Sequence, residues 1–395
     1  MKTKLTKQEK NWILYDVGNS AFTLLAATIL PIYFNYIAGK QGLSDVQYLA
    51  YWGYAVSIAT LLTALAGPVF GTVADTKGYK KPVFTIALGI GTIASVALGF
   101  AKYWLAFLVV FVIAKVGYSV TLVFYDSMLV DVTSEDRMDE VSSQGYAWGY
   151  IGSCVPFVIC LLVVLNAGKI GITMETAMMV SFVIITVWWV IMTLPLLKTY
   201  HQKYYVEKKQ HAFSESFKRI GITLKNVKKE KKVFLFLLAF FFYIDGVYTI
   251  IDMATAYGTA LGFESTGLLL ALLLTQVVAF PFAILFGRLS SRYDTAKLVT
   301  VCICAYLGIA IFAIFITQQW QFWVLAVLVG MFQGGIQSLS RSYFTKIIPS
   351  QKSGEYFGLM DVCGKGASFI GTTVVSLLSQ WTGKLNLSLG AISLF

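Results

Sequence analysis

The chain has 395 residues, of which 57% are hydrophobic and only 13% are charged, and its mean hydropathy is +0.72. A soluble protein of this length needs far more polar surface, so the composition excludes an ordinary soluble protein. The net charge of +11 therefore indicates membrane topology and contact with a lipid surface, and no nucleic-acid partner is expected.

Apolar runs follow one another along the whole chain. A helix that crosses the hydrocarbon core needs about 20 apolar residues. Complete runs of this length cover 11–38, 48–74, 82–101, 104–130, 142–166, 173–197, 232–260, 265–290, 296–317, 320–347 and 354–381. A twelfth run begins near Asn386 and stops at Phe395, so the last predicted helix looks truncated. The first run is too long for a cleavable signal peptide, and the pattern predicts an all-α, multi-pass membrane protein.

Lysine and arginine fall mainly in alternate loops. If the N-terminus lies inside the cell, the outer loops hold only Lys40, Lys102, Lys169 and Lys384, while the segment 198–232 and the other inner loops hold most of the remainder. This bias predicts cytoplasmic termini in a cytoplasmic membrane, with anionic lipids as partners of the inner surface.

The first run opens with polar residues, in the sequence Trp12-Ile-Leu-Tyr-Asp16-Val-Gly-Asn19-Ser-Ala-Phe22. An Asp and an Asn near the start of a membrane span are costly in lipid, so they are expected to face a wet interior. Asp16 and Asn19 are therefore candidate substrate-binding residues near the cytoplasmic end.

A second motif joins the second and third runs, in the sequence Gly71-Thr-Val-Ala-Asp75-Thr-Lys-Gly78-Tyr-Lys80-Lys81. The two glycines permit close packing and a tight turn. Asp75 ends a membrane helix, where a carboxylate can meet the positive end of another helix. The two lysines at the end of the motif are expected to hold the loop on the cytoplasmic side. An ordinary charged turn is the alternative.

Polar residues are divided unevenly among the runs. The first, fourth, seventh and tenth runs carry polar clusters, whereas the third, sixth and ninth carry no charge within their spans. Because polar groups are expensive in lipid, the four polar helices are predicted around a central cavity and the other three against lipid. The loop motif recurs in degenerate form as Gly287, Ser291, Asp294 and Lys297, which indicates two parallel halves.

These motifs carry a family resemblance. The loop motif resembles the loop between helices 2 and 3 of major facilitator superfamily transporters. The opening of the first run resembles the "unknown major facilitator" family, which includes bacterial members and the fungal autophagy-related vacuolar amino-acid effluxers, although Val17-Gly18 stands where that family more often has Trp-Ala. Further resemblance lies in Gly149–Ser153, Asp245–Val247, Leu339–Tyr343 and Gly354–Gly358, with Lys365 following.

The resemblance implies a major facilitator fold with two six-helix bundles around a central cavity. The bundles would cover 1–197 and 232–395, the last helix being incomplete, with a basic cytoplasmic linker over 198–231. It also implies that Asp75 lies against the start of the eleventh helix near Gly354 and acts as a conformational latch. The residues assigned to gating are Gly71, Asp75, Gly78, Lys80, Lys81 and Arg341.

The linker carries its own periodic pattern. Phe213, Phe217, Ile220, Leu224 and Val227 recur at helical spacing among basic residues. This pattern predicts an amphipathic helix at the inner leaflet, with a flexible charged linker as the alternative.

Charged residues near the middle of the membrane are candidates for solute binding. A lysine ammonium can take a carboxylate and an Asp can take an amine, so two of each near one depth suit a zwitterion. Fixed pairs that never touch substrate are the alternative, above all for Asp361 and Lys365, which are spaced i,i+4. With neutral hydrogen-bonding candidates and the acidic groups near the cytoplasmic end, the set is Lys115, Asp245, Asp361, Lys365, Gln333, Gln337, Asp16, Asn19 and Asp126.

The sequence thus predicts a secondary transporter that moves a small polar solute by alternating access. Amino-acid efflux follows from the resemblance, a coupling proton or cation is left open, and a monomer is expected. The sequence has no nucleotide-binding glycine loop, triad spacing or metal motif, so no enzyme, cofactor or metal is expected. A non-transporting sensor and a lipid-moving protein on a transporter scaffold are the alternatives.

Overall fold

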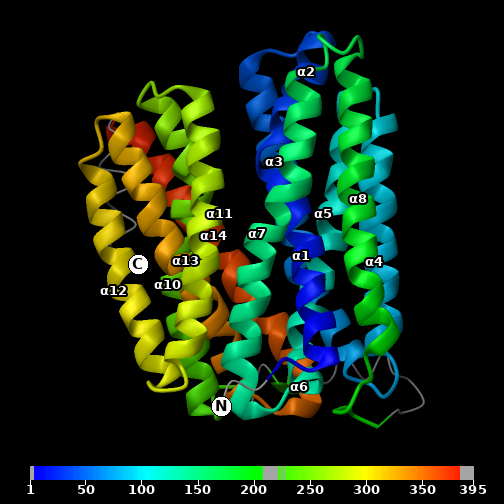
Figure 1. The fold of residues 1–395 in the computed structure, drawn as a ribbon, viewed down its shortest axis with the longest axis vertical. Coiled ribbons are helices and arrows are strands. Elements are labelled where there is room, and N and C mark those ends of the chain that lie inside the picture. Colours follow the sequence, from blue (N-terminus) through cyan, green and yellow to red (C-terminus); the bar gives the residue numbers. More distant parts are fainter. Residues whose placement is uncertain (1–3, 208–220, 224, 226, 383–395) are drawn as a thin grey trace. The chain divides into compact units, whose positions relative to one another are not determined.

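The computed structural model describes residues 4–207, 221–223, 225 and 227–382. Long α-helices dominate this part of the chain (Figure 1). The helices are α1 (Lys7–Ala27), α2 (Ile29–Lys40), α3 (Asp45–Ala74), α4 (Lys80–Ala97), α5 (Trp104–Ser127), α6 (Leu129–Val132), α7 (Met138–Leu165), α8 (Met174–Thr199), α10 (Lys231–Ala260), α11 (Ser265–Leu289), α12 (Thr295–Ile314), α13 (Gln319–Ile347) and α14 (Ser353–Thr382).

Among the described residues, ten helical segments are long and apolar enough to cross a membrane. They correspond to the first ten predicted runs, which confirms an all-α, multi-pass membrane protein. The predicted eleventh run is helix α14, which contains Glu355, Asp361 and Lys365 and is not one of the ten. The predicted twelfth run lies outside the described residues, as does most of the predicted amphipathic helix of the linker.

The first span, Lys7–Lys40, is interrupted at Thr28. The Thr28 hydroxyl donates to the Leu24 carbonyl at 2.5 Å, and its backbone leaves the helical region with φ −124° and ψ −65°. A threonine that bonds back to the preceding turn bends a helix. Pro31, which lacks an N–H, then falls in the first turn of α2, where no intrahelical donor is needed.

The chain forms two compact units. Unit 1 consists of Met1–Val132, Ile151–Ile220 and Pro349–Leu359, and unit 2 consists of Thr133–Tyr150, Gly221–Ile348 and Met360–Phe395. Two of the boundaries between the units fall inside helices, one in α7 between Tyr150 and Ile151 and one in α14 between Leu359 and Met360. The first turns of α14 therefore belong to unit 1, and the first turns of α7 belong to unit 2. The predicted division into bundles at 198–231 stays a prediction.

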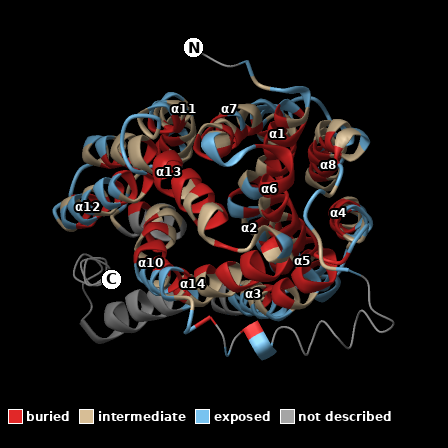
Figure 2. Ribbon diagram, turned by 90° about the horizontal axis from the view of Figure 1, so that it is seen from below, coloured by how far each residue is buried: buried red, intermediate tan, exposed pale blue. Residues whose placement is uncertain are grey.

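The core of unit 1 is built around α1. Trp12 stacks on Tyr125 of α5 with ring centroids 4.3 Å apart, and its indole N–H donates to the Tyr125 carbonyl at 3.0 Å. Figure 2 shows buried residues concentrated along α1 and α5. The ring stacking and the indole hydrogen bond fix the rotation of α1 about its own axis. They thereby also fix the position of Asp16 on this helix.

Several helices of unit 1 expose apolar stripes, and the stripe on α3 contains Tyr54, Ile58, Leu61 and Leu65. On α4 the exposed residues Ile86, Ile90 and Ile93 recur every three or four positions, and Val183 and Val187 do the same on α8. Apolar stripes of this length are not stable against water, so these faces suit lipid. Because α3 of the second run exposes a similar stripe, the prediction that the third, sixth and ninth runs are the ones against lipid stays a prediction.

Candidate functional site

The loop motif lies at the junction of α3 and α4 in unit 1. Helix α3 ends at Asp75, Gly78 takes a left-handed conformation with φ +75°, and α4 begins at Lys80. A positive φ is strained for other residues, which explains the glycine at position 78. At Gly71 a Cβ atom would overlap the Gly354 carbonyl, so the first turn of α14 packs directly on the backbone of α3.

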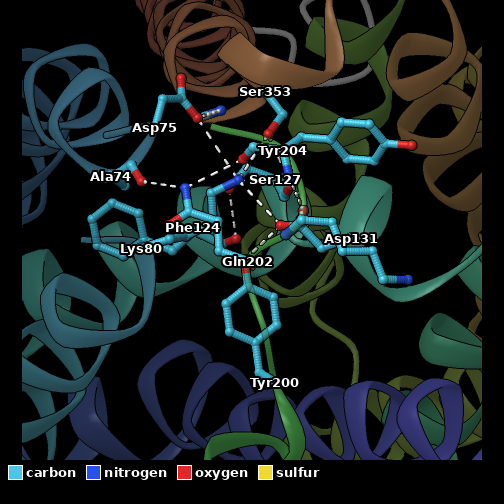
Figure 3. A network of polar contacts seen from close by, with 12 residues as sticks. Ala74, Asp75, Lys80, Phe124, Ser127, Asp131, Tyr200, Gln202, Tyr204 and Ser353 are labelled. Carbon is cyan, nitrogen blue, oxygen red and sulfur yellow. Dashed lines mark hydrogen bonds and ion pairs between the residues drawn. The ribbon is translucent and has the colours of Figure 1, made fainter. Parts of the chain in front are cut away.

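Asp75 caps the first turn of α14. Its carboxylate is fully buried, and its two oxygens accept hydrogen bonds from the backbone N–H groups of Gly354 and Glu355, both at 2.8 Å. The first N–H groups of a helix have no partner within the helix and mark its positive end. The family resemblance implied that Asp75 lies against the start of this helix, and the structure shows it there; Figure 3 shows Asp75 beside Ser353 of α14.

Lys80 is also fully buried, which the sequence did not predict. Its Nζ lies 3.7 Å from Asp75 Oδ1 and 3.5 Å from Asp131 Oδ2, and it donates to Ser353 Oγ at 2.9 Å (Figure 3). A buried ammonium is stable only when it is paired and hydrogen-bonded. Lys80 thus joins the end of α3, the end of α6 and the first turn of α14. Lys81, by contrast, is exposed.

Asp131, at the end of the fourth run, was not predicted as a functional residue. It is fully buried and accepts the Tyr200 hydroxyl at 2.5 Å and the backbone N–H groups of Lys203 and Tyr204 at 2.9 Å each. Burial, together with the neighbouring Asp131 carboxylate, raises the pKa of the Tyr200 phenol well above its ordinary value. An acidic residue directly after an apolar run was the available sequence signal.

Unit 2 has a polar cluster of its own where α7, α12 and α13 meet. Asp139, in the first turn of α7, is 2.6 Å from Lys346 Nζ and accepts the Thr295 hydroxyl at 2.7 Å. A Cβ at Gly287 would come within 2.6 Å of the Ser143 Cβ, so Gly287 approaches the start of α7 as Gly71 approaches the start of α14. The degenerate repeat of the loop motif therefore has a structural counterpart.

Arg341 belongs to this second cluster. It is buried, its Nε and Nη2 donate to the hydroxyl and the carbonyl of Ser142 at 2.9 Å each, and its guanidinium lies 4.3 Å from the centre of the Tyr146 ring. These contacts join α13 to the start of α7 within unit 2. They suit the predicted gating role of Arg341, which stays a prediction.

The candidate binding residues of unit 1 lie on α1 and α5. Asp16 is buried, accepts the Tyr125 hydroxyl at 2.9 Å and is 3.4 Å from the Asn19 side-chain nitrogen. Lys115 is half-buried, with its Nζ 5.7 Å from the centre of the Tyr118 ring. Asp126 is half-buried near the end of the same helix.

In unit 2 the candidates lie on α10, α13 and α14. Lys365 and Asp361 form an i,i+4 ion pair on α14 with distances of 2.5 and 2.6 Å, and each side chain is about one-fifth exposed. Asp245 of α10 is buried and accepts the Thr249 hydroxyl at 3.3 Å. Gln337 accepts the Tyr150 hydroxyl at 2.6 Å, and Gln333 is buried on the same helix.

The structure therefore brings Asp361 and Lys365 together, and separately Asp16 and Asn19. Lys115 belongs to unit 1, whereas Asp245 and Lys365 belong to unit 2. Their convergence on one central cavity stays a prediction.

The fold matches solved structures of membrane transporters. The human organic anion transporter MFSD10 aligns with a TM-score of 0.70 and 11% identity over 99% of this chain and 97% of that chain. The major facilitator transporter FucP, in the outward conformation, aligns with a TM-score of 0.70 and 15% identity over 98% and 94% of the two chains. The protein is therefore an all-α membrane protein with the major facilitator fold.

The sequence places the chain more narrowly. It matches the family described as "Vacuole effluxer Atg22 like" over residues 5–395, and the chain belongs to that family. An "Uncharacterized MFS-type transporter YxiO" of Bacillus subtilis is 42% identical over 389 residues, which cover 97% of this chain and 91% of that protein. The protein is therefore a secondary transporter of the major facilitator class.

Fungal relatives are more distant. Autophagy-related protein 22 of Eremothecium gossypii is 24% identical over 93% of this chain and 78% of its own length. Its namesake in Coccidioides immitis is 25% identical over 68% of this chain, and the aligned region spans about half of that protein, 48%. The predicted resemblance to this family is confirmed.

Proposed function

We propose that this transporter moves a small zwitterionic solute, an amino acid, across the cytoplasmic membrane by alternating access. The observation that carries the mechanism is the buried Asp75 carboxylate, which holds the first turn of α14 through two backbone N–H groups at 2.8 Å. The substrate class is supported by the ion pair on α14 and by the family's description as vacuole effluxers.

Asp75 suits a latch because its contacts are strong yet few. A hydrogen bond to a charged group contributes about 1.5–3 kcal/mol. Two such bonds, with Lys80 nearby, are enough to bias a conformational equilibrium, but they leave it reversible. The absence of a Cβ at Gly71 and at Gly354 lets the two backbones approach closely enough for these bonds to form.

Asp361 and Lys365 suit a zwitterion because they present a carboxylate and an ammonium one helical turn apart. Both remain about one-fifth exposed, although charges in a membrane helix are costly unless a polar partner or water reaches them. An amino acid could exchange its ammonium and carboxylate for those of the pair. Lys115 and Asp245 would supply further charged contacts, and Gln333 and Gln337 neutral ones.

The remaining parts of the proposal concern topology and partners. The lysine and arginine bias supports a cytoplasmic N-terminus, and anionic lipids at the inner leaflet are the expected partners of the basic linker. The protein would act as a monomer, and a coupling proton or cation would supply the driving force.

Flux measurements on purified protein in proteoliposomes test this proposal. Vesicles loaded with individual radiolabelled amino acids should lose at least one of them through the parent protein, and Lys365→Met should abolish that loss. Lys40→Met is a matched control, because Lys40 also forms an ion pair, with Glu175, but is more than half exposed at a helix end. Lipid movement without amino-acid flux would indicate the lipid-moving alternative, and no flux of either kind would indicate a sensor.

A further inference from the structure

Residues 200–207, here named the strap, follow α8 directly and lie along the loop between α3 and α4. The Val206 N–H donates to the Asp75 carbonyl at 2.7 Å, and the Val206 carbonyl accepts the Lys77 N–H at 3.0 Å. Thr76 and Val206 thereby form an isolated parallel β-bridge. The strap is therefore bonded through its backbone to Asp75 and Lys77 of this loop. The side chain of Asp75 in turn accepts the hydrogen bonds from the start of α14.

The Gln202 side chain fastens the strap to both sides of the loop. Its Nε2 donates to the carbonyl of Ala74, the last residue of α3, at 3.1 Å, and its Oε1 accepts the Gly78 N–H at 3.0 Å. The last carbonyls of a helix and the N–H groups of a tight turn have no regular partner. Gln202 satisfies one of each, so it stabilises the loop in this one conformation.

The strap also holds Asp131. The Tyr200 hydroxyl donates to Asp131 Oδ2, and the N–H groups of Lys203 and Tyr204 donate to Oδ1. The same Oδ2 is the atom that faces Lys80, at 3.5 Å. The strap therefore supplies three donors to the carboxylate that shares Lys80 with Asp75 (Figure 3).

We propose that the strap controls how firmly Asp75 holds the first turn of α14. Without the strap, the buried Asp131 would lose three donors and depend on Lys80 alone, drawing the ammonium away from Asp75 and Ser353. The loop would also lose the four hydrogen bonds contributed by Val206 and Gln202.

Hydrogen–deuterium exchange of the full-length protein in lipid nanodiscs tests this coupling. The amides of Gly354 and Glu355 donate to Asp75, so the exchange of a peptide covering 353–358 reports the state of the latch. In the strap variant Gln202→Ala with Val206→Pro, these amides should exchange at least about tenfold faster. Asp75→Ala sets the upper limit of the effect.

A matched control comes from the other end of unit 1. Gln41 also bridges two backbone groups, donating to the Lys102 carbonyl at 2.7 Å and accepting the Trp104 N–H at 3.2 Å. Gln41→Ala should leave exchange at 353–358 unchanged. If the strap variant also leaves it unchanged while Asp75→Ala accelerates it, the proposal is wrong.

A disulfide supplies a second test that does not depend on the strap variant folding. The bridge partners Thr76 and Val206 are changed to cysteine, in a protein that carries Gln202→Ala and lacks the native cysteines. Oxidation should restore slow exchange at 353–358, and reduction should reverse it. Exchange that is faster than in the parent protein and equal in the two states would contradict the proposal.

The inference rests on the proposed latch role of Asp75, and the two can fail separately. Exchange at 353–358 measures control of the latch by the strap, whereas amino-acid flux measures transport. If amino-acid flux is slow while exchange at 353–358 still responds to the strap variant, the result argues against the proposed function alone.

Discussion

Asp75→Asn is the sharpest perturbation of the latch because it keeps the shape of the side chain and removes its charge. The amide oxygen of an asparagine can accept one of the two N–H groups at the start of α14, and its NH2 group would then face the other donor. The Lys80 ammonium, 3.7 Å away, loses one of its two carboxylates.

The size of the effect follows from these contacts. Losing one charge-assisted hydrogen bond costs about 1.5–3 kcal/mol, and a carboxylate in a partly buried site at a helix N-terminus contributes up to about 2 kcal/mol. The two terms overlap, so we expect a loss of about 3 kcal/mol, which shifts the ratio of engaged to open latch by roughly 150-fold.

Distances between spin labels at Thr85 and Gln351 measure this shift. Both positions are exposed, one on α4 and one directly before α14, and both belong to unit 1. Asp75→Asn should add a population at longer distance. The control Glu175→Gln removes an exposed carboxylate that pairs with Lys40 and should change nothing. A distance distribution in Asp75→Asn identical to that of the parent would refute the latch.

Three further predictions follow from the same contacts. Gly71→Ala should open the latch by overlap with the backbone of α14, whereas Gly89→Ala, which has open space beside it, should not, and the same spin-label distances check this. Because burial raises the pKa of Tyr200 above its ordinary 10.0, the strap should stay attached through about pH 10 and detach only as the pH rises further; a fluorescent probe on the strap should show this step, and Tyr200→Phe should lack it. Lys346→Met should destabilise unit 2 by about 2 kcal/mol because Asp139 is left buried without its cation; thermal unfolding should show the loss, and also changing Asp139 to Asn should recover most of it.

The helices could be predicted because they depend on local patterns, whereas the contact of Asp75 with the start of α14 was implied by the resemblance of the loop motif to major facilitator transporters. Long apolar runs predict membrane helices, and the spacing of Gly71, Asp75 and Gly78 identifies a turn beside a helix end. The break at Thr28 was not predicted, because it depends on the rotamer with which the hydroxyl reaches the Leu24 carbonyl. Polar side chains within apolar runs identify candidates for function without identifying their partners.

The buried network around Asp131 could not be predicted for a different reason. Lys80 looked like a loop charge in sequence, and only the packing of α4, α6 and the first turn of α14 buries it. The strap left no periodic signal, because most of its bonds use backbone groups that every sequence offers. Its specific side-chain contacts come from Tyr200 and Gln202, which lie in a segment whose composition indicated only a linker.

Amino-acid counterflow in proteoliposomes most directly tests the claim that Asp75 gates transport without binding the solute. Asp75→Asn should lower the maximal rate at least about tenfold while the KM stays within about twofold of the parent value, because its contacts bias a conformational step. Lys365→Met should lose flux through the loss of solute binding. A raised KM with an unchanged maximal rate in Asp75→Asn, or parental kinetics in both variants, would contradict this assignment of roles.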